Sequence, residues 1–165
     1  MLDASWDRFW EDERIFGLGR QEPHRRRIRV LVAHEHLLYA EALIACIEED
    51  ERLQVIAHAG DGWEVLELAA GLLAAGLQPD VLVTSPELPG LDPSELTHRL
   101  HRVCPEARVV MIVRATEPGE FRPAYEAGAS ACVGNDCSVS GLLSTIAEVA
   151  EKANGRDPRR PVRRA

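Results

Sequence analysis

The sequence predicts an α/β protein in which a doubly wound parallel sheet of (βα)5 type lies between two layers of helices. Two observations indicate this class. Five short runs of β-branched and apolar residues lack regular polar alternation, as expected of strands buried on both faces. Each run is followed within a few residues by a segment whose apolar residues recur at helical spacing. Because parallel strands need a crossover between them, this alternation predicts a three-layer αβα architecture.

The expected strands end at polar or turn-forming residues. The third, "DVLVT", stops at Ser85, after which Pro86, Pro89 and Gly90 force a loop. The fourth, "ARVVMIV", is the most apolar. The expected strands span residues 28–33, 54–59, 80–84, 107–113 and 130–134.

The helices between these strands have recognisable starts and stops. Asp61 is a plausible cap for the second helix, Pro93 lies just inside the third, and Gly128 ends the fourth. In the first helix the apolar residues at helical spacing are Leu38, Ala42, Cys46 and Ile47. The expected helices span residues 36–49, 63–77, 92–103, 118–127 and 138–153. Five such units in about 125 residues are typical of the flavodoxin-like strand order 2-1-3-4-5.

Composition divides the 165 residues into an N-terminal extension (1–27), one domain (28–154) and a basic tail (155–165), which we expect to be disordered. The domain holds 8 basic and 20 acidic side chains, so its surface repels a phosphate backbone and direct DNA binding is not expected. No apolar run approaches the roughly 20 residues of a membrane span. The N-terminus carries acids where a signal peptide carries bases, and the four cysteines form no CxxC pair, so we expect a cytoplasmic protein.

Any site should lie where the predicted strand order reverses, between strands 1 and 3. The loops that follow these strands are "HEH" (34–36) and "SPELPG" (85–90). Carboxyl ends of parallel strands share one edge of the sheet, so we expect these two loops to meet there.

Several stretches together resemble the receiver domain of bacterial response regulators, in particular the kind attached to LuxR/NarL-type transcription factors. They are "IRVLVAHEHLLYAEAL", "AHAGDGWEVLELA", "PDVLVTSPELPGLD", "ARVVMIV" and "EAGASACVGNDCS". The resemblance covers residues 28–153 and implies a two-component signalling protein with a CheY-like fold.

The resemblance also indicates which positions the family uses for phosphoryl chemistry. The family's phosphoacceptor aspartate corresponds to Ser85, and its two acidic Mg²⁺ ligands correspond to His34 and Glu35. Its phosphoryl-sensing Thr or Ser corresponds to Val113, and its lysine to Asn135. Only Glu35 keeps its chemical type, and an aspartyl phosphate needs a carboxylate nucleophile. We therefore expect a degenerate pocket in a protein that is not an enzyme and needs no cofactor.

Two other interpretations of this pocket stay open. His34 or His36 could activate Ser85 as the base of a Ser–His hydrolase, although no G-x-S-x-G elbow surrounds that serine. His34 and His36, with Glu35 and Glu87 nearby, are also weak candidates for a metal site. We favour an accidental polar patch with no metal, because zinc sites normally assemble three or four closely spaced ligands.

Aromatic residues suggest contact surfaces. Trp63 stands near the start of the second helix, either as a partly exposed residue covering the sheet edge or as an anchor for a partner. Trp6, Phe9 and Trp10 would share one face of a helical turn. These three could dock on the protein's own body, or could anchor a partner or a second subunit.

The sequence thus favours a non-catalytic, phosphorylation-independent receiver that works by protein–protein contact, as a homodimer or as an adaptor. LuxR/NarL-type receivers often pair through their first and last helices. An alternative is the receiver portion of a DNA-binding transcription regulator, or a partner of one. In that case a small-molecule ligand in the altered pocket could replace phosphorylation as the switch.

Overall fold

Five parallel strands form a single sheet in the order β2-β1-β3-β4-β5, as predicted. The structure is a computed structural model and describes residues 26–114 and 117–153. The strands are β1 (Ile28–Ala33), β2 (Leu53–Ala59), β3 (Val81–Thr84), β4 (Arg108–Val113) and β5 (Ala131–Gly134). The helices are α1 (Leu37–Glu48), α2 (Gly62–Ala74), α3 (Pro93–Val103), the 3₁₀ helix η2 (Pro118–Phe121), α4 (Arg122–Glu126) and α5 (Val139–Ala153).

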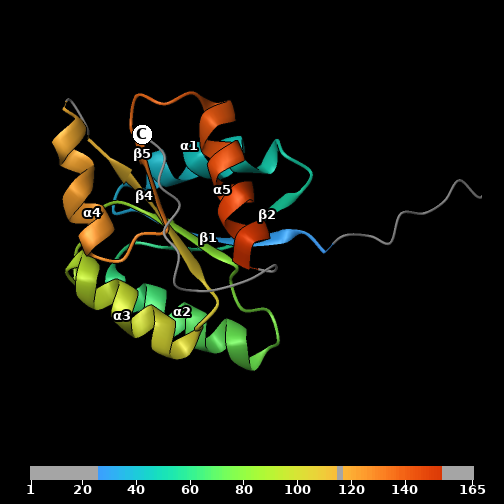
Figure 1. The fold of residues 1–165 in the computed structure, drawn as a ribbon. Coiled ribbons are helices and arrows are strands. Elements are labelled where there is room, and N and C mark those ends of the chain that lie inside the picture. The colour runs from blue at the N-terminus through green and yellow to red at the C-terminus, as the bar shows by residue number, and fades with distance from the viewer. Residues whose placement is uncertain (1–25, 115–116, 154–165) are drawn as a thin grey trace, which may run out of the picture.

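Helices cover both faces of this sheet (Figure 1). Helices α1 and α5 lie on one side, and α2 and α3 lie side by side on the other. Successive strand residues face opposite layers, so Leu82 and Val109 pack towards α2 and α3, whereas Val83 and Val110 pack towards α1 and α5. The sheet therefore separates two apolar cores, and this is the three-layer architecture that the unalternating strands predicted.

Strand β2 contains an irregularity where it pairs with β1. Val30 is paired with Val55, but the next residue, Leu31, is paired with Ala57. Ile56 is the extra residue of a bulge at this edge of the sheet.

The second helix is shorter than predicted. Asp61 caps its start by accepting a hydrogen bond from the Glu64 amide at 2.9 Å. The helix ends at Ala74 rather than at Leu77, because Gly76 has a left-handed backbone (φ +71°). The Leu77 amide then bonds back to the Leu72 carbonyl at 2.8 Å, which places Leu77 outside the helix.

The first helix buries only part of the set that its spacing indicated. Ile47 is buried and Cys46 is half-buried, whereas Leu38 is 81% exposed and Ala42 is exposed as well; Ala40 is buried instead. The segment "LLYAEALIACIE" is apolar on nearly every side, so its periodicity did not define the inward face. The fourth predicted helix is also different, since it begins as the 3₁₀ turn η2 before α4.

Within the described residues, no helix is both long enough and apolar enough to cross a lipid bilayer. The tail (155–165) and most of the N-terminal extension lie outside the described residues.

Candidate functional site

A cavity of about 170 Å³ opens at the carboxyl edge of the sheet, where the loops after β1 and β3 meet. Both predicted loops contribute to it, together with the first residues after β4 and β5. Its polar lining includes His34, Glu35, His36, Ser85, Arg114 and Asn135. The topology therefore brings the expected loops to one place, at the reversal of strand order.

The β1–α1 loop is organised around the ring of His34. Its Nδ1 accepts a hydrogen bond from the backbone amide of His36 at 3.0 Å, and its ring stacks on Tyr39 with 4.2 Å between centroids. His36 is the N-cap residue of α1, so this bond fixes the entry into the helix. The loop is thus held by an imidazole, in a place where an acidic pair would leave room for a cation.

The pKa of His34 is shifted downward. Burial lowers the pKa of this imidazole, and the charge of the neighbouring His36 lowers it further. The hydrogen bond with the His36 backbone, Glu35 and Glu87 oppose this shift.

Ser85 begins the loop after β3, and its backbone carbonyl accepts a hydrogen bond from the Leu88 amide at 3.3 Å. Among the described residues, no side chain forms a hydrogen bond with the Ser85 hydroxyl. His34 is engaged with the backbone of its own loop, and His36 Nε2 lies 3.4 Å from the Glu35 carboxylate. Neither histidine is positioned as a base for Ser85, so the Ser–His arrangement that the sequence left open is not assembled.

Of the remaining predicted positions, one lines the cavity and the other does not. Asn135 lines the cavity, and its backbone amide donates to the Val113 carbonyl at 2.9 Å. Val113 itself does not line the cavity; it is buried in the core between the sheet and the α2–α3 layer. Its neighbours Ile112 and Arg114 line the cavity instead.

Sequence reasoning overlooked two lining residues, Tyr39 and Arg114. Tyr39 follows His36 by one helical turn, and Arg114 is the first residue after β4, so both signals were present in the spacing. Among the described residues, no group of three histidine, cysteine or acidic side chains is arranged to hold a metal ion. The cavity thus combines a largely apolar lining, including the aromatic ring of Tyr39, with a few polar side chains.

Trp63 lies at the first turn of α2 and is 49% exposed. The guanidinium carbon of Arg99 on α3 sits 5.2 Å from its ring centroid, a cation–π contact. Trp63 also lies next to Gly90 of the loop after β3, so it covers that loop rather than the sheet edge. The other aromatic candidates, Trp6, Phe9 and Trp10, lie outside the described residues.

No protein-family model matches the sequence. Among curated proteins, it is 30% identical over 128 residues to protein-glutamate methylesterase/protein-glutamine glutaminase 1 of Caulobacter vibrioides, covering 76% of this chain and 36% of that protein. It is 25% identical over 135 residues to the probable transcriptional regulatory protein NarL of Mycobacterium tuberculosis, covering 82% of this chain and 59% of that protein. The chain thus spans between about a third and three fifths of the length of these curated relatives.

Solved structures show the same similarity. The response regulator domain of Thermotoga maritima CheB has a TM-score of 0.63 and 26% identity, over 81% of this chain and 100% of that domain. The receiver domain of the putative response regulator NarL of Mycobacterium tuberculosis shares the fold with a TM-score of 0.63, at 24% identity, over 79% of this chain and 99% of that one. The strand order, the site at its reversal and these similarities identify the described part of the chain as a CheY-like receiver domain of response regulators.

Proposed function

We propose that this receiver domain works without phosphorylation and without catalysis, and that it acts in signal transduction through contact with protein. The observation that carries the proposal is the serine at the start of the loop after β3. Receivers carry their phosphoacceptor aspartate at this position, and a hydroxyl with no adjacent base is a poor nucleophile near neutral pH.

The surroundings of Ser85 support the same function. Asn135 cannot provide the positive charge that a lysine would give to a transferring phosphoryl group. Val113 has no hydroxyl and its side chain is buried away from the cavity. His34 occupies one of the two positions of the Mg²⁺ ligands, where its Nδ1 accepts a hydrogen bond from the His36 amide and burial lowers its pKa.

Beryllofluoride with Mg²⁺ mimics an aspartyl phosphate and tests this proposal directly. The amide NMR spectrum of the protein should not change on its addition. The matched control carries His34→Asp, Ser85→Asp and Asn135→Lys, and its spectrum should change. Shifts clustered around Ser85 in the unaltered protein would contradict the proposal.

The contact surface that we propose lies over α1 and α5. Leu37, Leu38 and Tyr39 on α1 and Val139 on α5 are exposed apolar residues. A groove of about 180 Å³ runs between these helices, lined in part by Tyr39, Cys46 and Val139. Exposed apolar surface of this kind favours a protein contact, and a second copy of the chain fits the pairing typical of LuxR/NarL-type receivers.

Light scattering over a concentration series distinguishes the two modes of contact. A stable dimer that Leu38→Asp converts to a monomer would mean that the α1–α5 surfaces are permanently paired. Leu73→Asp, an exposed position on α2 at the opposite layer, is the matched control and should leave the mass unchanged. A monomer at all concentrations would mean that the surface serves an adaptor with a different protein partner.

A second candidate is suggested by the names of the relatives, several of which are transcriptional regulators. This chain would then be the receiver portion of such a regulator, or would act on a DNA-binding partner. Retention on duplex DNA that weakens with salt, and that is lost when residues 156–165 are removed, would support this candidate. Absence of retention at low salt would leave protein contact as the mode of action.

A further inference from the structure

An exposed apolar stripe runs along α2, on the layer opposite the proposed dimer surface. Trp63, Leu73 and Leu77 are 49%, 41% and 45% exposed, and Leu66 and Ala70 between them are also accessible. The four of these residues within α2, Trp63, Leu66, Ala70 and Leu73, are three, four and three residues apart. On a helix this spacing places side chains on one narrow face, as in the seam through which two helices associate. Leu77 is exposed as well, but it lies beyond the helix, after Gly76.

Helix α3 lies next to the stripe on one side. Arg99 of α3 lies over the Trp63 ring at the first turn of α2. At the other end, Leu73 shares a cavity of about 300 Å³ with Cys104, the residue that follows α3. The stripe therefore runs along the side of α2 next to α3, and the two helices lie side by side (Figure 1).

The N-terminal segment joins the domain at the lower end of this stripe. Arg26, the first described residue, lines the same cavity as Leu73, and its guanidinium is 2.7 Å from the Asp80 carboxylate. Arg29 donates to the carbonyl of Gly76, at the end of α2, at 3.1 Å. The described part of the chain thus begins beside Leu73, at the end of α2.

The length of that segment is sufficient to reach Trp63. The stripe spans 14 residue steps, or about 21 Å at a helical rise of about 1.5 Å per residue. The 15 residues from Glu11 to Arg25 could extend over about 50 Å, so Trp6, Phe9 and Trp10 can reach any point of the stripe.

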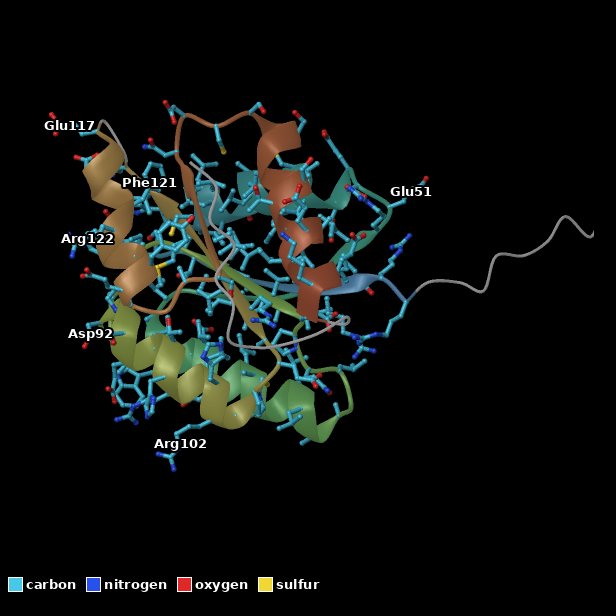
Figure 2. All side chains as sticks on the ribbon, in the orientation of Figure 1. Glu51, Asp92, Arg102, Glu117, Phe121 and Arg122 are labelled. Carbon is cyan, nitrogen blue, oxygen red and sulfur yellow. The ribbon has the colours of Figure 1, made fainter. Side chains whose placement is uncertain are left out.

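Basic side chains on α3 lie beside the stripe. Residues 3–13 contain five acidic side chains and one basic one. The exposed side chains of Arg99 and Arg102 belong to α3, and Figure 2 shows Arg102 extending outward from that helix. Arg99 is paired with Glu95, and α2 carries exposed Glu64 and Glu67, so Arg102 is the main attraction for an acidic segment on this side.

We propose that Trp6, Phe9 and Trp10 of this chain bind along the exposed apolar stripe of α2, with the acidic residues around them facing Arg99 and Arg102. The aromatic side chains remove Trp63, Leu73 and Leu77 from water, and the ionic contacts set the direction of the segment. The domain then covers this surface itself and leaves the α1–α5 surface for other proteins.

Fluorine NMR of the full chain labelled with 5-fluorotryptophan tests this contact, because the chain has three tryptophans. The signals are assigned with Trp6→Phe, Trp10→Phe and Trp63→Phe. We expect the signals of Trp6 and Trp10 to differ from that of free 5-fluorotryptophan. Leu73→Asp should move both signals to the free position, and Arg102→Glu should move them part of the way.

The matched control is Leu38→Asp, which places the same charge on the exposed face of α1 and should leave both signals in place. Amide spectra of the strands establish that each variant is folded. Signals of Trp6 and Trp10 at the free position in the unaltered chain, or signals that Leu73→Asp does not move, would overturn the proposal. Movement of the signals on dilution would also overturn it, since it would mean that the segment binds the stripe of a second copy.

Discussion

Two glycine-to-alanine substitutions in α2 should have opposite effects on stability. Gly71 lies in the interior of the helix, and a Cβ added there would meet nothing within 4 Å. Alanine should therefore raise the free energy of unfolding by about 0.5–1 kcal/mol, because glycine has more backbone freedom to lose on folding. Gly62 is the first residue of the same helix and is buried against the loop after β3.

A Cβ at Gly62 would lie 2.9 Å from the Cβ of Leu91 and 3.3 Å from its backbone nitrogen. Rotation of the Leu91 side chain cannot relieve this contact, because a Cβ is fixed to its backbone. The loop must move, and the hydrogen bond from the Gly62 amide to the Pro89 carbonyl, 2.8 Å long, must be strained. Overpacking of this kind costs about 1–3 kcal/mol.

Urea unfolding of the full chain measures both effects. The two variants should differ by about 1.5–4 kcal/mol, which separates their midpoints by about 0.75–2 M if the slope is about 2 kcal/mol per M. Equal stabilities, or a Gly62→Ala variant that is more stable than the unaltered protein, would refute the close approach of α2 to this loop. A changed slope would indicate instead that the denatured state was altered.

Three further measurements test other parts of the structure. Asp92→Ala should lower the free energy of unfolding in the same urea experiment by about 1 kcal/mol, since this carboxylate caps α3 by accepting hydrogen bonds from two backbone amides. Asp92→Asn should change the free energy of unfolding little, because asparagine also caps helices. The imidazole of His34 should titrate below 6.5 by NMR, and a titration above 6.5 would contradict the burial. Because the folded state binds this proton less tightly than the unfolded chain does, the contribution of His34 to stability is present above pH 6.5 and is lost as the pH falls through the folded pKa. Burial raises the pKa of Cys132 to about 12, so iodoacetamide at pH 8 should label the exposed Cys137 well before Cys132. Mass spectrometry measures the order of labelling, and the reverse order would be inconsistent with the described packing.

The sheet and the position of its site could be predicted because both depend on a strong pattern. Unbroken apolar strands alternating with helices have few arrangements, and the reversal of strand order fixes which loops meet. The sequence alone therefore predicts that the loops carrying His34 and Ser85 meet, and both line the same cavity. The family positions within them came from resemblance to receivers, and spacing alone would not have assigned them a chemical role.

The remaining differences have local physical causes. Leu38 shares helical spacing with Ile47 but is exposed, because a helix that is apolar on most sides does not specify its inner face. Leu77 was placed inside α2 because its spacing continues the helix, although Gly76 before it adopts the backbone that ends one. Val113 was grouped with the pocket by its place at the end of β4, and the alternation of side chains along that strand directs it to the other layer.

The bulge in β2 changes which layer each half of that strand serves. Before Ile56, Leu53 and Val55 pack with the α1–α5 core; after it, Ala57 and Ala59 pack with the α2–α3 core. All four residues have odd numbers, so in a regular strand of this sequence they would face the same side. The extra residue Ile56 therefore lets the edge strand present larger side chains to α1 at one end and small ones to α2 at the other. Deleting Ile56 would remove the bulge and leave both halves facing their present layers, because Val55 and Ala57 would then be successive residues of a regular strand.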